Sequence, residues 1–73
     1  MKIDITRLDL IMARKHINYK ALASMMGISY RSLYHLLHES KNPRPVTVGT
    51  LAHKLGVDVA EIVTLKDYDG FNV

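Results

Sequence analysis

Residues 18–37 constrain the fold more tightly than any other part of the chain. Asn18 is a good N-cap, because its side chain can accept hydrogen bonds from the unpaired backbone N–H groups at the start of a helix. Apolar residues then recur at helical spacing as far as Gly27, which can adopt the left-handed conformation that ends a helix. Ser29 is the N-cap of a second helix, in which three leucines follow the same spacing. The stretch predicts two short helices joined by a tight turn.

Short fragments at fixed spacing extend this pattern over most of the chain, roughly residues 6–65. In order, they are Leu22-Ala23, Gly27-Ile28-Ser29, Ser32-Leu33, Leu36, Thr50-Leu51-Ala52, Leu55-Gly56-Val57 and Glu61-Ile62. The ordered set resembles the Cro/CI-type DNA-binding family, also called the XRE or lambda-repressor-like family. The resemblance implies an all-α fold, a compact five-helix domain. In it, helices 2 and 3 form a helix-turn-helix, and helix 3 enters the DNA major groove.

The caps and apolar positions predict helices near residues 6–15, 19–26, 30–38, 48–55 and 59–64. Thr6 is the expected N-cap of the first helix, and Asp9 stands in the capping-box position three residues later. Gly56 is expected to end the fourth helix with a left-handed C-terminal cap. Asp58 and Glu61 are expected to form a capping box at the start of the fifth.

The two ends of the chain give weaker signals. Residues 1–5 alternate apolar and polar side chains as a short strand does, and the apolar segment available to pair with such a strand is 70–73. A frayed N-terminus is the simpler prediction. Residues 66–73 are expected to be a tail on a single helix-turn-helix domain that spans residues 1–73, with its core in residues 6–65.

Two apolar residues stand where the family that the chain resembles commonly has a charged pair. That family pairs an Arg on helix 1 with a Glu near the end of helix 3, and the matching positions are Met12 and Leu37. Exchange of a buried ion pair for packed apolar groups is often neutral or stabilising. We therefore expect Met12 and Leu37 to contact each other.

The positive charge of the chain is concentrated on the predicted helix-turn-helix and the loop after it. The whole chain of 73 residues carries a net charge of +3. Residues 14–45 hold six Lys and Arg residues against Glu39 alone, a net charge of +5, whereas the remainder holds four against six carboxylates, a net charge of −2. A basic surface on this segment favours contact with DNA phosphates.

Composition argues against several other classes of function. The chain contains no cysteine, which excludes disulfide and thiolate chemistry. No apolar run approaches the roughly 18 residues of a membrane span, and the N-terminus lacks the apolar region of a signal peptide, so a cytoplasmic location is expected. His35 and His38 are three residues apart without a third ligand, so neither a metal nor another cofactor is expected. No nucleophile–base pair, phosphate-binding loop or carboxylate pair indicates an enzyme.

The resemblance assigns DNA contacts to three parts of the sequence. Helix 3 is expected to face the groove, with Arg31 placed for a bidentate contact to guanine and His35 one turn further on the same face. The start of helix 2 and the loop after helix 3 are expected to meet phosphates. Packing against neighbours is an equal alternative for Tyr30 and Tyr34, and Tyr19 stands where the family often has Gln. The full predicted set is Tyr19, Lys20, Ser29, Tyr30, Arg31, Ser32, Tyr34, His35, Lys41, Asn42 and Arg44.

Two functions remain open at this point. The first is a transcriptional regulator, such as a repressor, that binds specific sequences of double-stranded DNA. We expect it to be a homodimer, because one short helix reads few bases and because Leu10, Met25, Leu65 and Phe71 are more apolar residues than so small a core needs. The family commonly dimerises through the region around helix 5 and the loop before it. The second function is a protein-interaction module on the same fold, such as an antitoxin or an anti-repressor. The positive charge around helix 3 favours the first.

Overall fold

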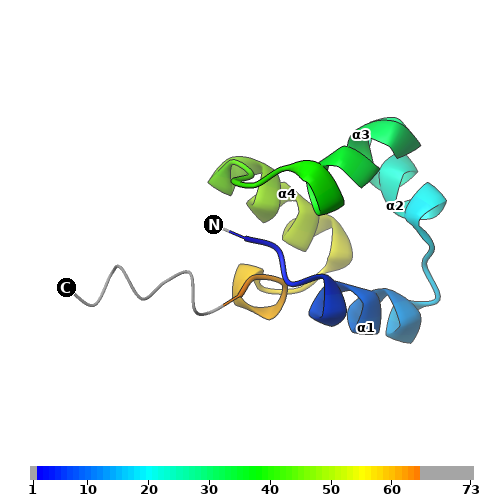
Figure 1. Cartoon of the computed structure of the whole chain (residues 1–73). Coiled ribbons are helices and arrows are strands. Elements are labelled where there is room, and N and C mark those ends of the chain that lie inside the picture. The colour runs from blue at the N-terminus through cyan, green and yellow to red at the C-terminus, as the bar shows by residue number, and fades with distance from the viewer. Residues whose placement is uncertain (1, 65–73) are drawn as a thin grey trace.

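The computed structural model describes residues 2–64, and every element in this part of the chain is helical (Figure 1). The elements in chain order are α1 (Ile5–Lys15), α2 (Tyr19–Met26), α3 (Tyr30–Tyr34), the π-helical turn η1 (His35–Glu39), α4 (Pro45–Leu55) and the 3₁₀ turn η2 (Val59–Glu61). The predicted all-α fold is confirmed. The expected count of five α-helices is wrong, because the element predicted near residues 59–64 is a single 3₁₀ turn. The predicted tail, residues 66–73, lies outside the described residues.

Helix α1 begins earlier than the sequence predicts. Its N-cap is Asp4, whose extended backbone precedes the helix and whose carboxylate accepts a hydrogen bond of 3.2 Å from the Arg7 N–H. Thr6, the expected cap, instead lies within the first turn of α1. Both residue types cap helices well, so local preference alone does not separate them. The choice is made by tertiary contacts of the residues just before the helix.

These contacts join the N-terminal segment to the residues that follow η2. Ile3 forms an isolated antiparallel bridge with Val63, and the Asp4 N–H donates a hydrogen bond of 2.8 Å to the Ile62 carbonyl. Ile3 is itself buried in the core. The predicted frayed terminus is therefore wrong at Ile3. The alternative pairing partner, residues 70–73, lies outside the described part of the chain.

The caps around α2 and α3 agree with the sequence-based prediction. The Asn18 side chain accepts a hydrogen bond of 2.8 Å from the Ala21 N–H at the start of α2. Gly27 ends α2 with φ 71°, in the left-handed region where glycine has no steric cost. The Ser29 hydroxyl accepts a hydrogen bond of 3.0 Å from the Ser32 N–H at the start of α3. The two helices and the turn between them form the predicted helix-turn-helix.

The third helix changes its geometry half-way along. Helix α3 is only five residues long and runs directly into η1, in which the Ser40 N–H donates a hydrogen bond of 2.8 Å to the His35 carbonyl, five residues back. Together the two elements extend to Glu39, one residue beyond the predicted end. Short π-helical turns within helices are frequent at functional sites, which directs attention to the side chains at both ends of η1.

Helix α4 begins at Pro45, three residues before the predicted start at residue 48. Proline is well suited to the first position of a helix, because its missing N–H would have no partner there and its φ is already helical. The helix ends at Gly56, whose φ of 71° confirms the predicted left-handed cap. The predicted capping box of Asp58 and Glu61 is also confirmed, at the start of η2.

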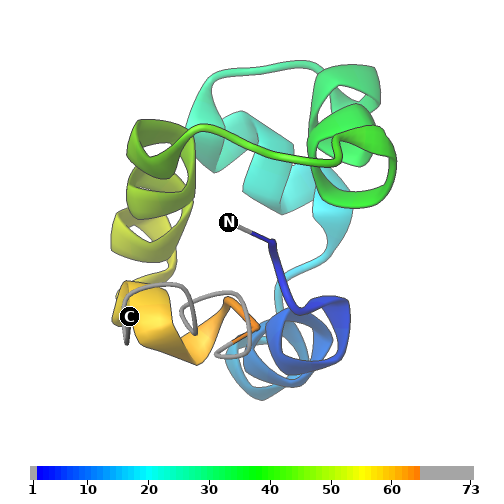
Figure 2. The ribbon, with the colours of Figure 1, turned by 60° about the vertical axis from the view of Figure 1, so that its left-hand side comes forward.

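The core lies between the four helices, which surround it as Figure 2 shows. Each element contributes apolar side chains, and the largest fully buried ones are Leu8, Leu22, Leu33, Leu51, Leu55 and Ile62. Met12 and Leu37 are both buried in the same core. Their direct contact stays a prediction, to be tested by coupling in a double-mutant cycle.

The backbone conformation at the end of α1 leads to a prediction about stability. His16 caps α1 with φ 58°, the only positive φ outside glycine in residues 2–64. A residue with a Cβ pays about 1–2 kcal/mol for this conformation. Glycine removes that cost but gains entropy in the unfolded chain, so we expect His16→Gly to stabilise the fold by a net amount of about 1 kcal/mol and to raise the melting temperature by about 4–8 °C. Thermal denaturation followed by circular dichroism measures this change.

The matched control for this substitution is Gly27→Ala, at φ 71°. It places a Cβ in the conformation from which His16→Gly removes one, so it should lower the melting temperature by a similar amount. A lower melting temperature for His16→Gly would contradict the strain assigned to this cap.

Candidate nucleic-acid interface

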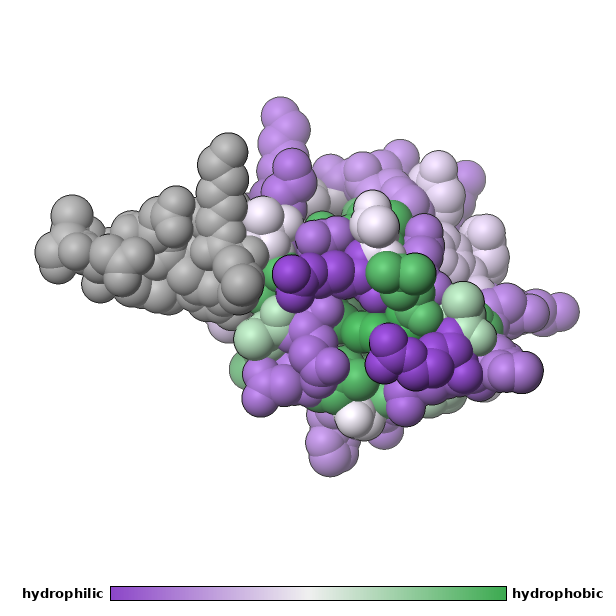
Figure 3. Space-filling model, turned by 90° about the horizontal axis from the view of Figure 1, so that it is seen from below, coloured by the Kyte–Doolittle hydropathy of each residue, from purple (hydrophilic) through white to green (hydrophobic). Residues whose placement is uncertain are grey.

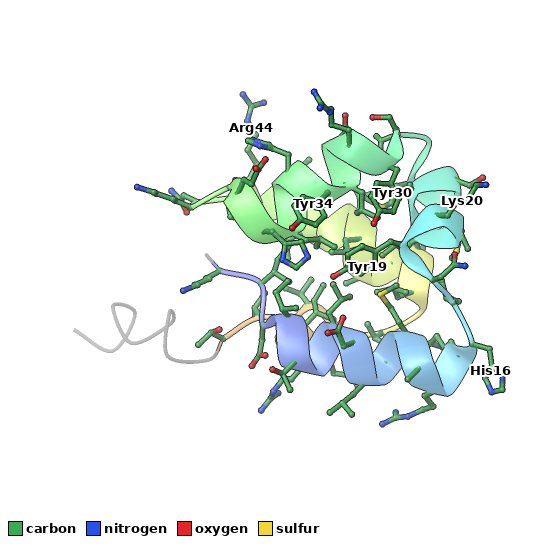
Figure 4. The ribbon with its side chains drawn as sticks, turned by 45° about the vertical axis from the view of Figure 1, so that its right-hand side comes forward. His16, Tyr19, Lys20, Tyr30, Tyr34 and Arg44 are labelled. Atoms are coloured by element: carbon green, nitrogen blue, oxygen red, sulfur yellow. The ribbon has the colours of Figure 1, made fainter. Side chains whose placement is uncertain are left out.

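Four exposed basic side chains lie on the third helix or on the segments next to it in the fold. Arg31 lies on α3 itself, Lys20 lies in the first turn of α2, and Lys41 and Arg44 lie on the loop between η1 and α4. Figure 4 shows Lys20 and Arg44 on either side of α3. Exposed positive charge thus comes from α2, from α3 and from the loop after η1, and such charge suits a polyanion.

The exposed side of the third helix is hollowed. We call this hollow the recognition surface, and it is lined by Tyr30, Arg31, Ser32, Tyr34, His35 and Glu39. Five of these six residues belong to the set predicted from the sequence. Glu39 was missed, because a carboxylate is an unexpected neighbour for DNA phosphates. Its position four residues after His35 is the signal that could have found it.

At one end of the recognition surface, a carboxylate and an imidazole are in direct contact. The His35 Nδ1 lies 2.9 Å from the Glu39 Oε1, and the two side chains are 65% and 60% exposed. The two residues mark the first and last positions of η1. A contact between two side chains as exposed as these adds little stability. Its interest lies in the hydrogen bond that the carboxylate forms with the imidazole.

An aromatic cluster joins the start of α2 to the third helix. The Tyr19 hydroxyl lies 3.0 Å from the His38 Nε2, and the His38 ring lies 4.5 Å from the ring of Tyr34, measured between centroids. The Tyr30 ring lies 6.3 Å from that of Tyr19. Figure 4 shows the three labelled tyrosines gathered between the two helices. Tyr30 and Tyr34 therefore pack against neighbouring rings and are also exposed on the recognition surface. The sequence had left packing and DNA contact as equal alternatives for these two residues.

His38 is the second residue that the sequence-based prediction missed. It lies four residues after Tyr34, which places both on one side of a helix, but nothing in the sequence places Tyr19 beside them. The hydrogen bond between His38 and Tyr19 therefore fixes the first residue of α2 against η1.

Tyr19 keeps its proton more firmly than an ordinary tyrosine. Burial raises the pKa of its hydroxyl, and the neighbouring charge of Asp9 raises it further, with smaller effects from Tyr30 and Tyr34. The hydroxyl can both donate and accept. When the His38 Nε2 carries a proton, the hydroxyl can accept a hydrogen bond from it and donate its own proton to a phosphate oxygen.

The remaining predicted residues divide into caps and loop positions. Ser29 caps α3 and also donates a hydrogen bond of 3.0 Å to the Ser32 hydroxyl, so both serines have a structural role at the helix start. Lys41 and Asn42 are exposed on the loop after η1. Five of the predicted residues thus line the recognition surface, and the others lie at the start of α2, at the N-cap of α3 and on the loop after η1.

The described residues show neither a cluster suited to a metal ion nor a membrane span. No three His, Asp or Glu side chains within residues 2–64 are grouped so that they could bind a metal. Nor does any helix in this part of the chain combine the length and the apolar character that crossing a bilayer requires.

A family model described as the Cro/C1-type HTH DNA-binding domain matches residues 7–67. The match covers most of the chain and includes nearly all of every helix described above. No curated protein and no solved structure is significantly similar to the chain.

Proposed function

The chain belongs to the Cro/C1-type HTH DNA-binding domain family, and from this premise we propose that it is a transcriptional regulator that binds specific DNA sequences in the cytoplasm. The observation that carries this proposal is the recognition surface with basic side chains around it. A recognition helix in the major groove reads base edges with its exposed side chains, while its flanks bind the two sugar–phosphate strands.

The arrangement of the side chains suggests a division of labour on the DNA. Arg31 and His35 lie on the recognition surface, and we assign the reading of base edges to them. We assign phosphate binding to Lys20 and Arg44, which lie on either side of α3, and to Lys41 on the loop after η1. Phosphate contacts fix the register of the protein on the duplex without reading its sequence.

Salt dependence tests the phosphate part of this proposal. Each neutralised phosphate releases counterions, so the slope of log K against log salt concentration becomes shallower by about 0.9 for each phosphate that a variant no longer neutralises. We expect Lys41→Ala and Arg44→Ala each to weaken binding to all DNA sequences alike and to reduce the slope by about one unit. Fluorescence anisotropy on a specific and a random duplex, at several salt concentrations, measures both effects.

Arg14→Ala is the matched control for these variants. It removes the same charge from α1, on the opposite side of the molecule from α3 (Figure 1), where Arg14 lies beside Leu10. Its slope should equal that of the wild type. Equal slopes for Arg44→Ala and the wild type would remove Arg44 from the DNA contacts.

We also propose that the protein binds DNA as a homodimer. Among residues 2–64, Val46 and Leu10 are the most exposed large apolar side chains, at 78% and 61%. Leu10 belongs to α1, on the side seen in Figure 3, where apolar side chains lie among hydrophilic ones. Val46 lies near the start of α4, two residues after Arg44, and we propose that the second copy binds there. Leu65 and Phe71 lie outside the described residues.

A pair of serine variants tests this dimer. Val46→Ser should lower the fraction of dimer on a palindromic site, whereas Leu10→Ser should leave it unchanged, because a contact through α1 would turn the third helices away from one duplex. Analytical ultracentrifugation with and without the duplex measures the fraction. A wild-type protein that is monomeric in both conditions would rule out the dimer.

A further inference from the structure

We propose that Glu39 fixes the tautomer of His35, so that His35 selects adenine or cytosine, the bases that present an amino group in the major groove. This inference rests on the proposed function. It assigns a positioning role to a carboxylate that the sequence-based prediction did not include, and a base class to the histidine beside it.

The hydrogen bond between the two side chains determines which nitrogen of His35 carries the proton. The His35 Nδ1 lies 2.9 Å from the Glu39 Oε1. An ionised carboxylate can only accept hydrogen bonds, so the proton between these atoms belongs to Nδ1. In a neutral imidazole only one nitrogen carries a proton. The Nε2 of a neutral His35 is therefore an acceptor.

The acceptor nitrogen of His35 belongs to a side chain that lines the recognition surface. His35 lies one turn after Arg31, and both line the recognition surface. The His35 side chain is 65% exposed, so the hydrogen bond to Glu39 leaves the ring accessible to a DNA base. Because Nδ1 is occupied, Nε2 is the ring atom left to meet a base.

The base edges of DNA differ in whether they offer a donor to this nitrogen. In the major groove, adenine presents its N6 amino group and cytosine its N4 amino group, whereas guanine and thymine present the acceptors O6 and O4. An acceptor nitrogen bonds to the first two and is opposed by the last two. Without Glu39, the imidazole is free to carry its proton on Nε2 and to donate to guanine or thymine. The Glu39 carboxylate thus sets the base preference of His35 by holding the proton on its Nδ1.

The experiment has one arm without DNA and one with it. In the free protein at pH 8, where an ordinary imidazole is neutral, ¹⁵N chemical shifts report which ring nitrogen of His35 carries the proton. We expect a protonated Nδ1 in the wild type and a shift toward protonated Nε2 in Glu39→Ala. The second arm sequences duplexes that are bound from a random library.

In the second arm, the base position read by His35 is the one at which His35→Ala loses its preference. We expect the wild type to favour adenine or cytosine there, and Glu39→Ala to reduce this preference about tenfold, within the range that one base contact supplies. Lys41→Ala is the control, since removal of a phosphate-binding side chain weakens binding without changing the preference at this position.

The outcomes separate this inference from the proposed function. A wild-type motif that favours guanine or thymine at the His35 position would overturn the role of Glu39 and leave the proposed function intact. The same conclusion would follow if Glu39→Ala kept the wild-type base preference at that position. A protonated Nε2 in the wild type would overturn it equally. A wild type that enriches no sequence would overturn the proposed function and, with it, base selection by His35.

Discussion

Replacement of Arg31 by alanine is expected to weaken binding to the preferred DNA site by about 1–3 kcal/mol and to flatten the preference at one base position. Arg31 lies on the recognition surface, where its guanidinium can donate two parallel hydrogen bonds to the O6 and N7 atoms of guanine. Alanine removes both donors and leaves the helix backbone unchanged. Competition binding against duplexes with each of the four bases at every position measures the weakening and locates it.

Arg14→Ala, on the opposite side of the molecule, is again the control, and its preferences should match those of the wild type. If Arg31→Ala weakened specific and random duplexes equally, Arg31 would bind a phosphate, and the proposed register of the third helix would be wrong. If it changed neither, the protein-interaction module would become the better account of the chain.

The second large effect concerns stability. Leu33 has no exposed surface and packs in the core from α3. Leu33→Ala removes buried methyl groups and leaves a cavity, which typically costs about 2–5 kcal/mol. That cost is comparable with the whole free energy of unfolding of a domain this small. We expect the variant to be largely unfolded and to lose DNA binding with its fold. Chemical denaturation followed by circular dichroism measures the change.

Leu10→Ala makes the same chemical change at a side chain that is 61% exposed. It should alter the free energy of unfolding by less than about 0.5 kcal/mol. A Leu33→Ala variant as stable as Leu10→Ala would contradict the packing of α3 on the core.

The parts of the fold that the sequence predicts well are those that depend on neighbouring residues. Asn18 and Ser29 cap helices through hydrogen bonds to groups three residues away. Gly27 and Gly56 end helices because of their own backbone freedom. These signals are local, so they can be read without the tertiary structure, and together they place the helix-turn-helix correctly.

The predictions that failed depended on contacts between distant residues. Asp4 caps α1 because its backbone is held by Ile62, and Ile3 is ordered because it pairs with Val63. The order of the N-terminus is thus determined by residues at the other end of the fold. The alternation in residues 1–5 is compatible with a strand, but it does not identify Val63 as the partner of Ile3.

The candidate site shows the same limit. Arg31 and His35 were predicted from the resemblance to the family, and both line the recognition surface in the structure. The contact of Tyr19 with His38 depends on how α2 meets the third helix, which no spacing within one helix predicts. Glu39 differs, because it lies four residues after His35, and helical spacing alone makes the two side chains neighbours.

The most direct test of sequence-specific DNA binding by the third helix is selection from a random duplex library, with wild type and Arg31→Ala treated in parallel. The account predicts one enriched motif for the wild type, bound about 10³-fold or more tightly than random DNA at physiological salt. It also predicts that Arg31→Ala retains the motif except at one base position. A wild type that enriches no motif, or an Arg31→Ala variant with a motif identical to that of the wild type, would contradict it.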